Sequence, residues 1–219
     1  MVSKKKTIEM LDVIDKMYPD AECELVHKNS FELTIAVLLS AQATDVHVNK
    51  VTKELFKKYQ TPEDFLSVPL EEVQNDIRSI GLYRNKGKNI QKLCRDLIDR
   101  FDGQIPDNYE DLVSLAGVGR KTANVVLSVA FDVPRIAVDT HVERVSKRLG
   151  IARYKDSVIE VEETLMKKVP KERWSKTHHQ LIFFGRYHCV ARAPKCPQCP
   201  LLADCREGQK RMKKLKVLP

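Results

Sequence analysis

The sequence LAGVGRKTA, residues 115–123, separates two runs in which apolar residues recur at helical spacing. The chain has to reverse direction across Gly117-Val118-Gly119, and this pattern predicts a helix-hairpin-helix at about residues 109–131. The backbone N–H groups of Gly117, Val118 and Gly119, with those that open the second helix, are expected to form a site for a phosphate. Glycine at both ends of the turn also lets a ligand approach the main chain closely.

Lys121 falls in the first turn of the second predicted helix. The positive end of the helix dipole disfavours a cation there, so the position suggests a functional lysine. The plainer interpretation is a tight turn followed by a solvated surface lysine. A motif this short does not decide between the two, and the rest of the chain has to supply the distinction.

Apolar residues at helical spacing continue along the chain, and no stretch shows a sustained period of two. We expect Gly81 to cap the end of a helix that covers residues 70–80. Asp139 or Thr140 is expected to begin another helix, with Glu143 completing a capping box. The sequence therefore predicts an all-α fold.

The net charge of +8 on 219 residues is concentrated near the carboxyl terminus. From Arg186 to Pro219 there are nine Lys or Arg residues and two acids, a formal +7, which leaves +1 for the rest of the chain. Such a segment is either a solvated tail or a nonspecific contact for nucleic acid. Its densest part comprises Lys210, Arg211, Lys213, Lys214 and Lys216.

The sequence contains no apolar run long enough to span a bilayer. The longest uninterrupted run covers only Ile35–Leu39, and the amino-terminal sequence MVSKKKTIEM lacks the apolar core of a secretory signal. We therefore expect a cytoplasmic, monomeric protein with no membrane partner, in which the thiols stay reduced.

Four cysteines near the carboxyl terminus have the spacing Cys189-x6-Cys196-x2-Cys199-x5-Cys205. Four thiols so close together in a reduced compartment are typical of metal ligands, because thiolates are soft donors. Structural zinc sites usually combine two short knuckles, whereas here only Cys196 and Cys199 form one. The pattern favours a [4Fe-4S] cluster, with tetrahedral zinc as the alternative.

Two connecting segments carry side chains that suggest a partner. Arg192 and Lys195 lie between the first two of these cysteines, so a closed cluster would present two cations on a fixed loop, suited to phosphates. Leu82 and Tyr83 lie on a predicted connection between helices. Apolar residues on such a connection are either packed under a neighbouring element or kept for a partner.

The motifs together resemble one protein family. LAGVGRKTAN, AVDTH (residues 137–141), LLSAQATD (residues 38–45) and the four-cysteine loop occur in the order and spacing of the endonuclease III family, the bifunctional base-excision glycosylases of the helix-hairpin-helix superfamily. The resemblance extends over nearly the whole chain. It implies two helical lobes with a DNA cleft between them. Residues 23–133 would form a helical barrel that contains the hairpin, and residues 1–22 with 134–219 would form the iron-sulfur lobe.

The resemblance also implies site residues, with Lys121 as the nucleophile and Asp139 as its carboxylate partner. The amine would attack C1′ of a damaged nucleotide, expel the base through a Schiff base, and break the strand 3′ to the lesion by β-elimination. The nucleotide must first be flipped out of the duplex, and Gln42 and Leu82 would fill the gap. Asp139 is equally well explained as a helix N-cap, and the two roles are compatible.

The expected partner is double-stranded DNA with a damaged base, chiefly an oxidised pyrimidine, or with an abasic site, so the protein would be nucleoid-associated when bound. Two alternatives remain open. An adenine-mismatch glycosylase shares the hairpin, the aspartate and the cluster, but it lacks the nucleophilic lysine and carries an additional recognition domain. A noncatalytic DNA-binding module would use the hairpin, the basic segment and the metal loop for affinity alone.

Overall fold

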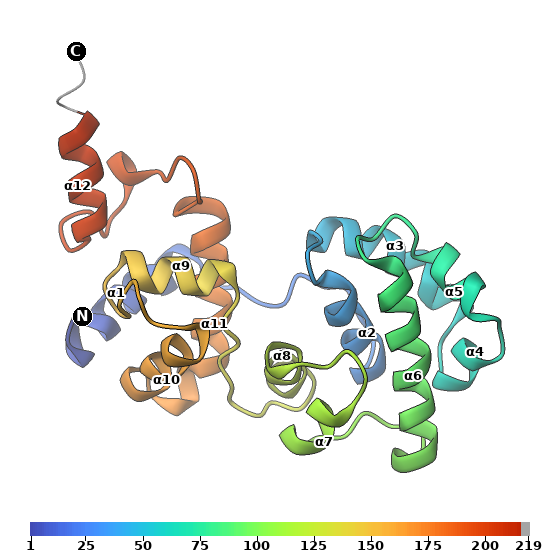
Figure 1. Cartoon of the computed structure of the whole chain (residues 1–219). Coiled ribbons are helices and arrows are strands. Elements are labelled where there is room, and N and C mark those ends of the chain that lie inside the picture. Colours follow the sequence, from blue (N-terminus) through green and yellow to red (C-terminus); the bar gives the residue numbers. More distant parts are fainter. Residues whose placement is uncertain (216–219) are drawn as a thin grey trace. The chain divides into compact units, whose positions relative to one another are not determined.

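The structure, a computed structural model, describes residues 1–215. These residues form twelve α-helices joined by turns and short 3-10 and π segments, and no strand occurs among them (Figure 1). The predicted all-α fold class is confirmed. Lys216, the last cation of the predicted basic segment, lies outside the described residues.

The chain divides into two compact units. One is continuous and consists of Cys23–Val133, which we call the hairpin unit. The other joins Met1–Glu22 to the described residues from Pro134 onward, and we call it the cysteine unit.

The hairpin unit is organised around one helix that is buried on all sides. In this helix, α2 (Ser30–Ser40), every residue from Phe31 to Leu39 is buried, as a continuous apolar run requires. It packs against α3, α6 and α8, and α6 packs in turn against α4 and α5 (Figure 1). The other helices are α3 (Asp45–Lys58), α4 (Pro62–Leu66), α5 (Leu70–Asp76), α6 (Tyr83–Phe101), α7 (Tyr109–Ser114) and α8 (Arg120–Ala130).

Side-chain caps set where several of these helices begin. The side chains of Asn29, Thr44 and Thr61 accept hydrogen bonds from backbone N–H groups in the first turns of α2, α3 and α4. Each bond satisfies a donor that has no partner within its helix. At the start of α4, the carboxylate of Asp64 also accepts a hydrogen bond from the backbone N–H of Thr61, which completes a capping box. Pro62 is the first residue of this helix, a position that proline favours.

The predicted helix over residues 70–80 is shorter than expected. Helix α5 ends at Asp76, and turns follow it up to Leu82. Gly81 is not left-handed, whereas Leu82 is, with φ 61° and ψ 25°. The prediction that Gly81 caps this helix is wrong, because the left-handed residue begins α6 and does not end α5.

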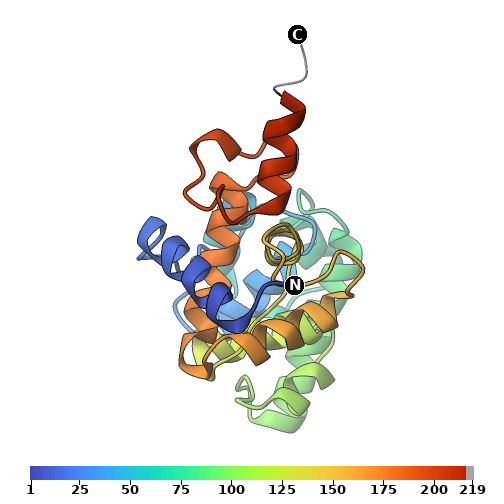
Figure 2. The same cartoon turned by 90° about the vertical axis from the view of Figure 1, so that its left-hand side faces the viewer.

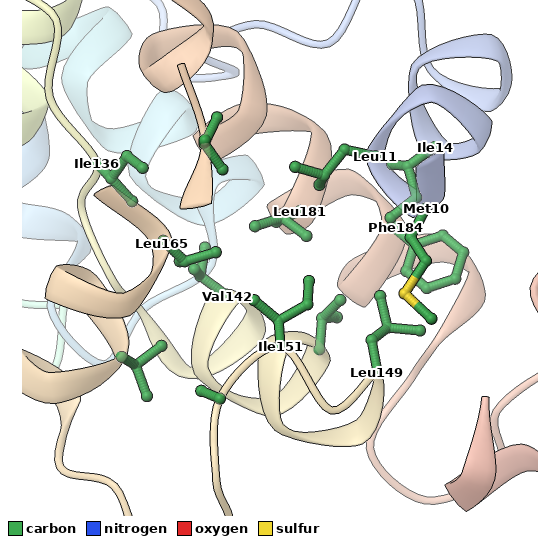
Figure 3. Packing of buried hydrophobic residues seen from close by; sticks show 14 of the residues in the cluster. Met10, Leu11, Ile14, Ile136, Val142, Leu149, Ile151, Leu165, Leu181 and Phe184 are labelled. Carbon is green, nitrogen blue, oxygen red and sulfur yellow. The ribbon is translucent and has the colours of Figure 1, made fainter. Parts of the chain in front are cut away.

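The cysteine unit has a core assembled from both ends of the chain. Leu11 and Ile14 of the amino-terminal helix pack with Val142, Leu165 and Leu181 from the carboxyl-terminal part (Figure 3). A helix with such an apolar stripe needs this partner to be stable. The elements of the unit are α1 (Lys4–Met17), α9 (Thr140–Arg148), α10 (Val158–Lys168), η1 (Lys171–Arg173), α11 (Trp174–Phe183), η2 (Phe184–His188), η3 (Cys196–Gln198) and α12 (Arg206–Leu215).

The start of α9 follows the prediction only in part. Asp139 is the N-cap of this helix. Glu143 does not complete a capping box, because with Asp139 as the N-cap the third helical position is Val142. The carboxylate of Glu143 instead accepts a hydrogen bond from Lys147 Nζ at 2.6 Å, one turn further along. The predicted capping box is therefore wrong, although the helix begins where expected.

The described part of the basic segment is folded. Residues 206–215 form α12, which contacts η3 and α9, and Figures 1 and 2 both show it beside the loop that carries the cysteines. Four of the predicted cations, Lys210, Arg211, Lys213 and Lys214, are therefore on a helix. No helix within residues 1–215 is long and apolar enough to cross a membrane.

Candidate DNA-processing site

The turn between α7 and α8 is held by a glycine that no other residue could replace without strain. Gly117 has φ +79°, and a Cβ atom there would lie 2.8 Å from Leu38 Cδ1 and 3.0 Å from Asn89 Cβ. Leu38 belongs to α2 and Asn89 to α6, so the turn packs closely on both helices. Gly119 differs, because its φ is −92° and a Cβ would meet nothing within 4 Å. The space beside Gly119 is open to a ligand.

A pair of alanine variants separates the roles of these two glycines. Gly117→Ala should destabilise the protein by about 1–3 kcal/mol, because it combines a left-handed backbone with a close contact. Gly119→Ala should cost less, about 0.5–1 kcal/mol, because alanine is a poorer N-cap than glycine. It should weaken DNA binding, because the new methyl group occupies the open space. Thermal unfolding and DNA titration of both variants give the comparison. Equal loss of stability in the two would contradict this description of the turn.

The first turn of α8 has the properties of an anion site. Its N-cap is Gly119, and no side chain caps it. Amides at an uncapped helix start can bind a phosphate. The N–H of Val118 donates to the carbonyl of Leu115 at 3.1 Å, and its side chain is buried. Lys121 follows in this first turn with its side chain exposed.

Gln42 and Leu82 are both exposed on turns of the hairpin unit, and both have left-handed backbones. Their φ angles are 59° and 61°, values that non-glycine residues adopt uncommonly. Leu82 is 56% exposed, so it is not packed under a neighbouring element. Strained residues of this kind cluster at functional positions.

Asp139 is held firmly by the helix that it begins. Its Oδ1 accepts hydrogen bonds from the backbone N–H groups of His141 and Val142, both at 2.8 Å. The N-cap explanation is therefore correct.

Two arginines of α9 hold the start of the cysteine loop, a feature that the sequence analysis missed. Arg144 donates to the backbone carbonyls of Gly185 at 2.7 Å and Cys189 at 3.3 Å. Arg148 approaches Cys189 Sγ at 3.5 Å and donates to the carbonyls of the next two residues at 2.8 and 2.7 Å. Asp139 and the loop are therefore attached to one helix. Arg144 and Arg148 lie four positions apart, and so on one face of the helix that follows AVDTH, and this spacing was the signal available in the sequence.

The four predicted metal ligands line one pocket. Cys189, Cys196, Cys199 and Cys205 are all free thiols, and all four line the same pocket. Within residues 1–215, no three His, Cys, Asp or Glu side chains have the arrangement of a single-ion site. The two findings are compatible, because each thiolate of a cubane cluster binds a separate iron atom. We therefore treat the pocket as the candidate cofactor site.

The surroundings of these thiols suit a positively charged group. Burial raises the pKa of Cys196, Cys199 and Cys205, and the neighbouring cysteines raise it further. Four thiolates would repel one another without a cation between them. The backbone N–H of Gly208 donates to Cys205 Sγ at 3.3 Å, a contact that stabilises a thiolate.

The loop between the first two cysteines keeps its cations accessible. Arg192 and Lys195 are both exposed. The N–H of Lys195 donates to the carbonyl of His188 at 3.1 Å, which holds this end of the loop against η2. The loop therefore carries two exposed cations, and one end of its backbone is attached to η2.

The predicted site residues fall into two groups. The hairpin unit holds Gln42, Leu82, Lys121 and the turn at residues 117–119, and the close packing of Gly117 joins that turn to α2 and α6. The cysteine unit holds Asp139, the four cysteines, Arg192 and Lys195.

Comparison with known proteins identifies the family. Residues 35–171 match the HhH-GPD superfamily of base excision DNA repair proteins. Endonuclease III of Bacillus subtilis (strain 168) is 68% identical over 214 residues, which cover 98% of each chain. The chain belongs to the endonuclease III family.

Two solved endonuclease III structures are similar in fold. One is a trapped endonuclease III–DNA covalent intermediate, an estranged-adenine complex, with a TM-score of 0.95, 67% identity, and coverage of 97% of this chain and 100% of that one. The other is a non-covalent endonuclease III–DNA complex, with a TM-score of 0.96, 66% identity and the same coverage. The resemblance to the endonuclease III family predicted from the sequence is confirmed.

Proposed function

We propose that this member of the endonuclease III family is a base-excision DNA glycosylase with AP lyase activity, and that Lys121 is its nucleophile. The observation that carries the proposal is an exposed lysine in the first turn of an uncapped helix, two residues after the open Gly119. A relative that is 67% identical over 97% of this chain has been trapped as a covalent intermediate with DNA. A covalent enzyme–DNA bond requires a nucleophile on the protein.

The reaction follows from the chemistry of an amine and a deoxyribose. The neutral Nζ of Lys121 attacks C1′, the bond from C1′ to the base breaks, and the base leaves with a proton. The ring opens to a Schiff base between Nζ and C1′. Loss of a proton from C2′ then expels the 3′ phosphate by β-elimination and breaks the strand on that side.

Asp139 has a second function in this proposal. Positive charge develops on the sugar as the base leaves, and a nearby carboxylate stabilises it. Because Oδ1 is held by two backbone N–H groups at 2.8 Å, the carboxylate has a fixed orientation and Oδ2 can face the sugar or shuttle protons. The proposed mechanism requires Lys121, which belongs to the hairpin unit, and Asp139, which belongs to the cysteine unit, to act on the same nucleotide.

The remaining polar residues hold the DNA. The amides of Gly117, Gly119 and the first turn of α8 bind a phosphate beside the lesion and place the sugar at Lys121. Arg192 and Lys195 contact the backbone from the cysteine loop.

Gln42 and Leu82 enter the duplex when the nucleotide leaves it. Leu82 is 56% exposed on a turn, and an apolar side chain that inserts between bases can replace the lost stacking. Gln42, with an amide that both donates and accepts, can pair with the orphaned base.

The four cysteines fit a [4Fe-4S] cluster, which Cys189, Cys196, Cys199 and Cys205 would hold. When bound, the cluster supplies iron–thiolate bonds that close the loop, and no step above requires electron transfer. Arg144 and Arg148 already fix the start of the same loop. Tetrahedral zinc is the competing occupant of these ligands.

Replacing one cysteine tests the cofactor. Cys199→Ser should lose most of its iron and the visible absorbance of the cluster, because Cys199 is one of the four proposed ligands. Cys94→Ser is the control, since Cys94 is buried in the hairpin unit, whereas the four predicted ligands belong to the cysteine unit. Iron and zinc are measured by elemental analysis. Zinc without iron in the wild-type protein would contradict the cluster assignment.

We also propose that the damaged base is an oxidised pyrimidine and that the protein acts on chromosomal DNA in the cytoplasm. Membership of the endonuclease III family supports this class of lesion. Release of the base from a panel of duplexes with oxidised pyrimidines, oxidised purines or mismatched adenine tests it. Preference for mismatched adenine would contradict the proposal.

Borohydride separates the proposed function from both alternatives. It reduces a Schiff base to a stable amine, so an enzyme that acts through Lys121 becomes covalently attached to abasic DNA. An adenine-mismatch glycosylase would release the base without becoming attached. A noncatalytic DNA-binding module would give neither product.

A further inference from the structure

The turns that carry Gln42 and Leu82 are held in unfavourable conformations. Both residues have left-handed backbones, with φ of 59° and 61°. Such residues keep this conformation only where the surrounding structure determines it. The hydrogen bonds made to these two turns therefore determine where the side chains of Gln42 and Leu82 are held.

Lys86 is a buried cation that caps the helix before Gln42. Lys86 is only 5% exposed, and its Nζ donates hydrogen bonds to the carbonyls of Leu39 at 3.0 Å and Ala41 at 2.6 Å. Leu39 lies in the last turn of α2, and Ala41 is its C-cap residue, directly before Gln42. Carbonyls at this end of a helix lack partners and carry the negative end of the dipole, so the ammonium satisfies them.

The backbone of the same lysine is bonded to the other turn. Lys86 lies in the first turn of α6, and its N–H donates to the carbonyl of Leu82 at 3.0 Å. Figure 1 shows that α2 ends and α6 begins at the same end of the hairpin unit. Lys86 therefore connects the turn of Gln42 to the turn of Leu82.

The Leu82 turn is also fastened to two other helices. His47 of α3 approaches the carbonyl of Ser79 through Nε2 at 3.0 Å. Gln74 of α5 donates to the carbonyl of Arg84 at 3.0 Å. The Leu82 turn is thus fixed on α3 and α5, and the side chain of Lys86 extends this fixed structure to the end of α2.

We propose that Lys86 is a positioning residue that holds Gln42 and Leu82 at a fixed separation, so that both enter the duplex in one step. The inference rests on the proposed function, in which these two residues replace the extruded nucleotide. Without the bonds from Nζ, the two turns move independently, and one side chain enters without the other. Opening of the lesion pair becomes slow, while chemistry on an already unpaired nucleotide does not change.

A double-mutant cycle tests this coupling. Lys86→Met keeps the length of the side chain and removes both hydrogen bonds from Nζ. Opening of a thymine glycol pair is followed by the fluorescence of an adjacent 2-aminopurine. We expect Lys86→Met to slow opening at least tenfold in the wild-type background and less than threefold in a Gln42→Ala background, because coupled residues are not additive.

Two measurements distinguish positioning from general damage. Borohydride trapping on a single-stranded abasic oligonucleotide needs no pair opening, so Lys86→Met should react within twofold of the wild-type rate. Lys92→Met is the matched control, because Lys92 is exposed on the same helix, and it should open the lesion at the wild-type rate. If Lys86→Met does not fold, Lys86→Arg enters the same cycle, since its planar guanidinium changes the carbonyl geometry and keeps the charge.

The outcomes separate this inference from the proposed function. Equal slowing by the Lys86 variant in both backgrounds, or no slowing, overturns the positioning role while wild-type trapping still succeeds. Failure of the wild-type protein itself to be trapped on abasic DNA overturns the proposed function. Slowing that disappears in the Gln42→Ala background supports the positioning role.

Discussion

Lys121→Gln is expected to bind lesion DNA with nearly wild-type affinity and to perform no chemistry. Glutamine keeps a polar side chain in the first turn of α8 but has no amine that could form a Schiff base. Loss of a covalent nucleophile lowers the rate by about 10⁴-fold or more. Single-turnover base release and strand cleavage on a thymine glycol duplex measure the loss.

Thermal unfolding provides the control for this variant. Because Lys121 is exposed, the substitution should change stability by less than about 0.5 kcal/mol. Base release by the variant at a rate close to wild type would mean that another group attacks the sugar.

Asp139→Asn is expected to separate the two functions of this residue. Asparagine caps a helix about as well as aspartate, so the two 2.8 Å hydrogen bonds from α9 should persist and stability should change by a few tenths of a kcal/mol. The negative charge that stabilises the developing cation is lost. We expect base release to fall by about 10²–10³-fold, equivalent to roughly 3–4 kcal/mol.

Asp139→Ala is the matched comparison. It removes the charge and the cap together, so it should also destabilise the protein by about 1 kcal/mol. If the Asn variant released bases as fast as the wild-type protein, the N-cap would be the whole function of Asp139. If it were destabilised as much as the Ala variant, its loss of rate could not be assigned to charge.

The sequence was sufficient for the features that depend on local chemistry. Gly117 could be assigned to the hairpin because only glycine adopts a left-handed turn without strain, and the structure adds the close contacts with Leu38 and Asn89. Asp139 was predictable as an N-cap because its side chain bonds to residues two and three positions away. The cysteine spacing indicated a shared site for the same reason.

Features that depend on contacts between distant residues could not be predicted. Lys86 bonds to Leu39 and Ala41, which lie 47 and 45 positions away, and nothing near it in the sequence marks it as buried. Leu82 has the left-handed backbone that the adjacent Gly81 would adopt at lower cost, so Gly81 was a misleading signal. Glu143 could complete a capping box only with Thr140 as the N-cap, and the structure has Asp139 in that place.

The most direct test of the central claim is to identify the residue that carries the sugar. The wild-type protein is trapped on abasic DNA with borohydride, the DNA and protein are digested, and the modified peptide is sequenced by mass spectrometry. We predict that the reduced sugar remnant is attached to Nζ of Lys121. A remnant on any other lysine, or on the terminal amine, would contradict the assignment of Lys121 as the nucleophile.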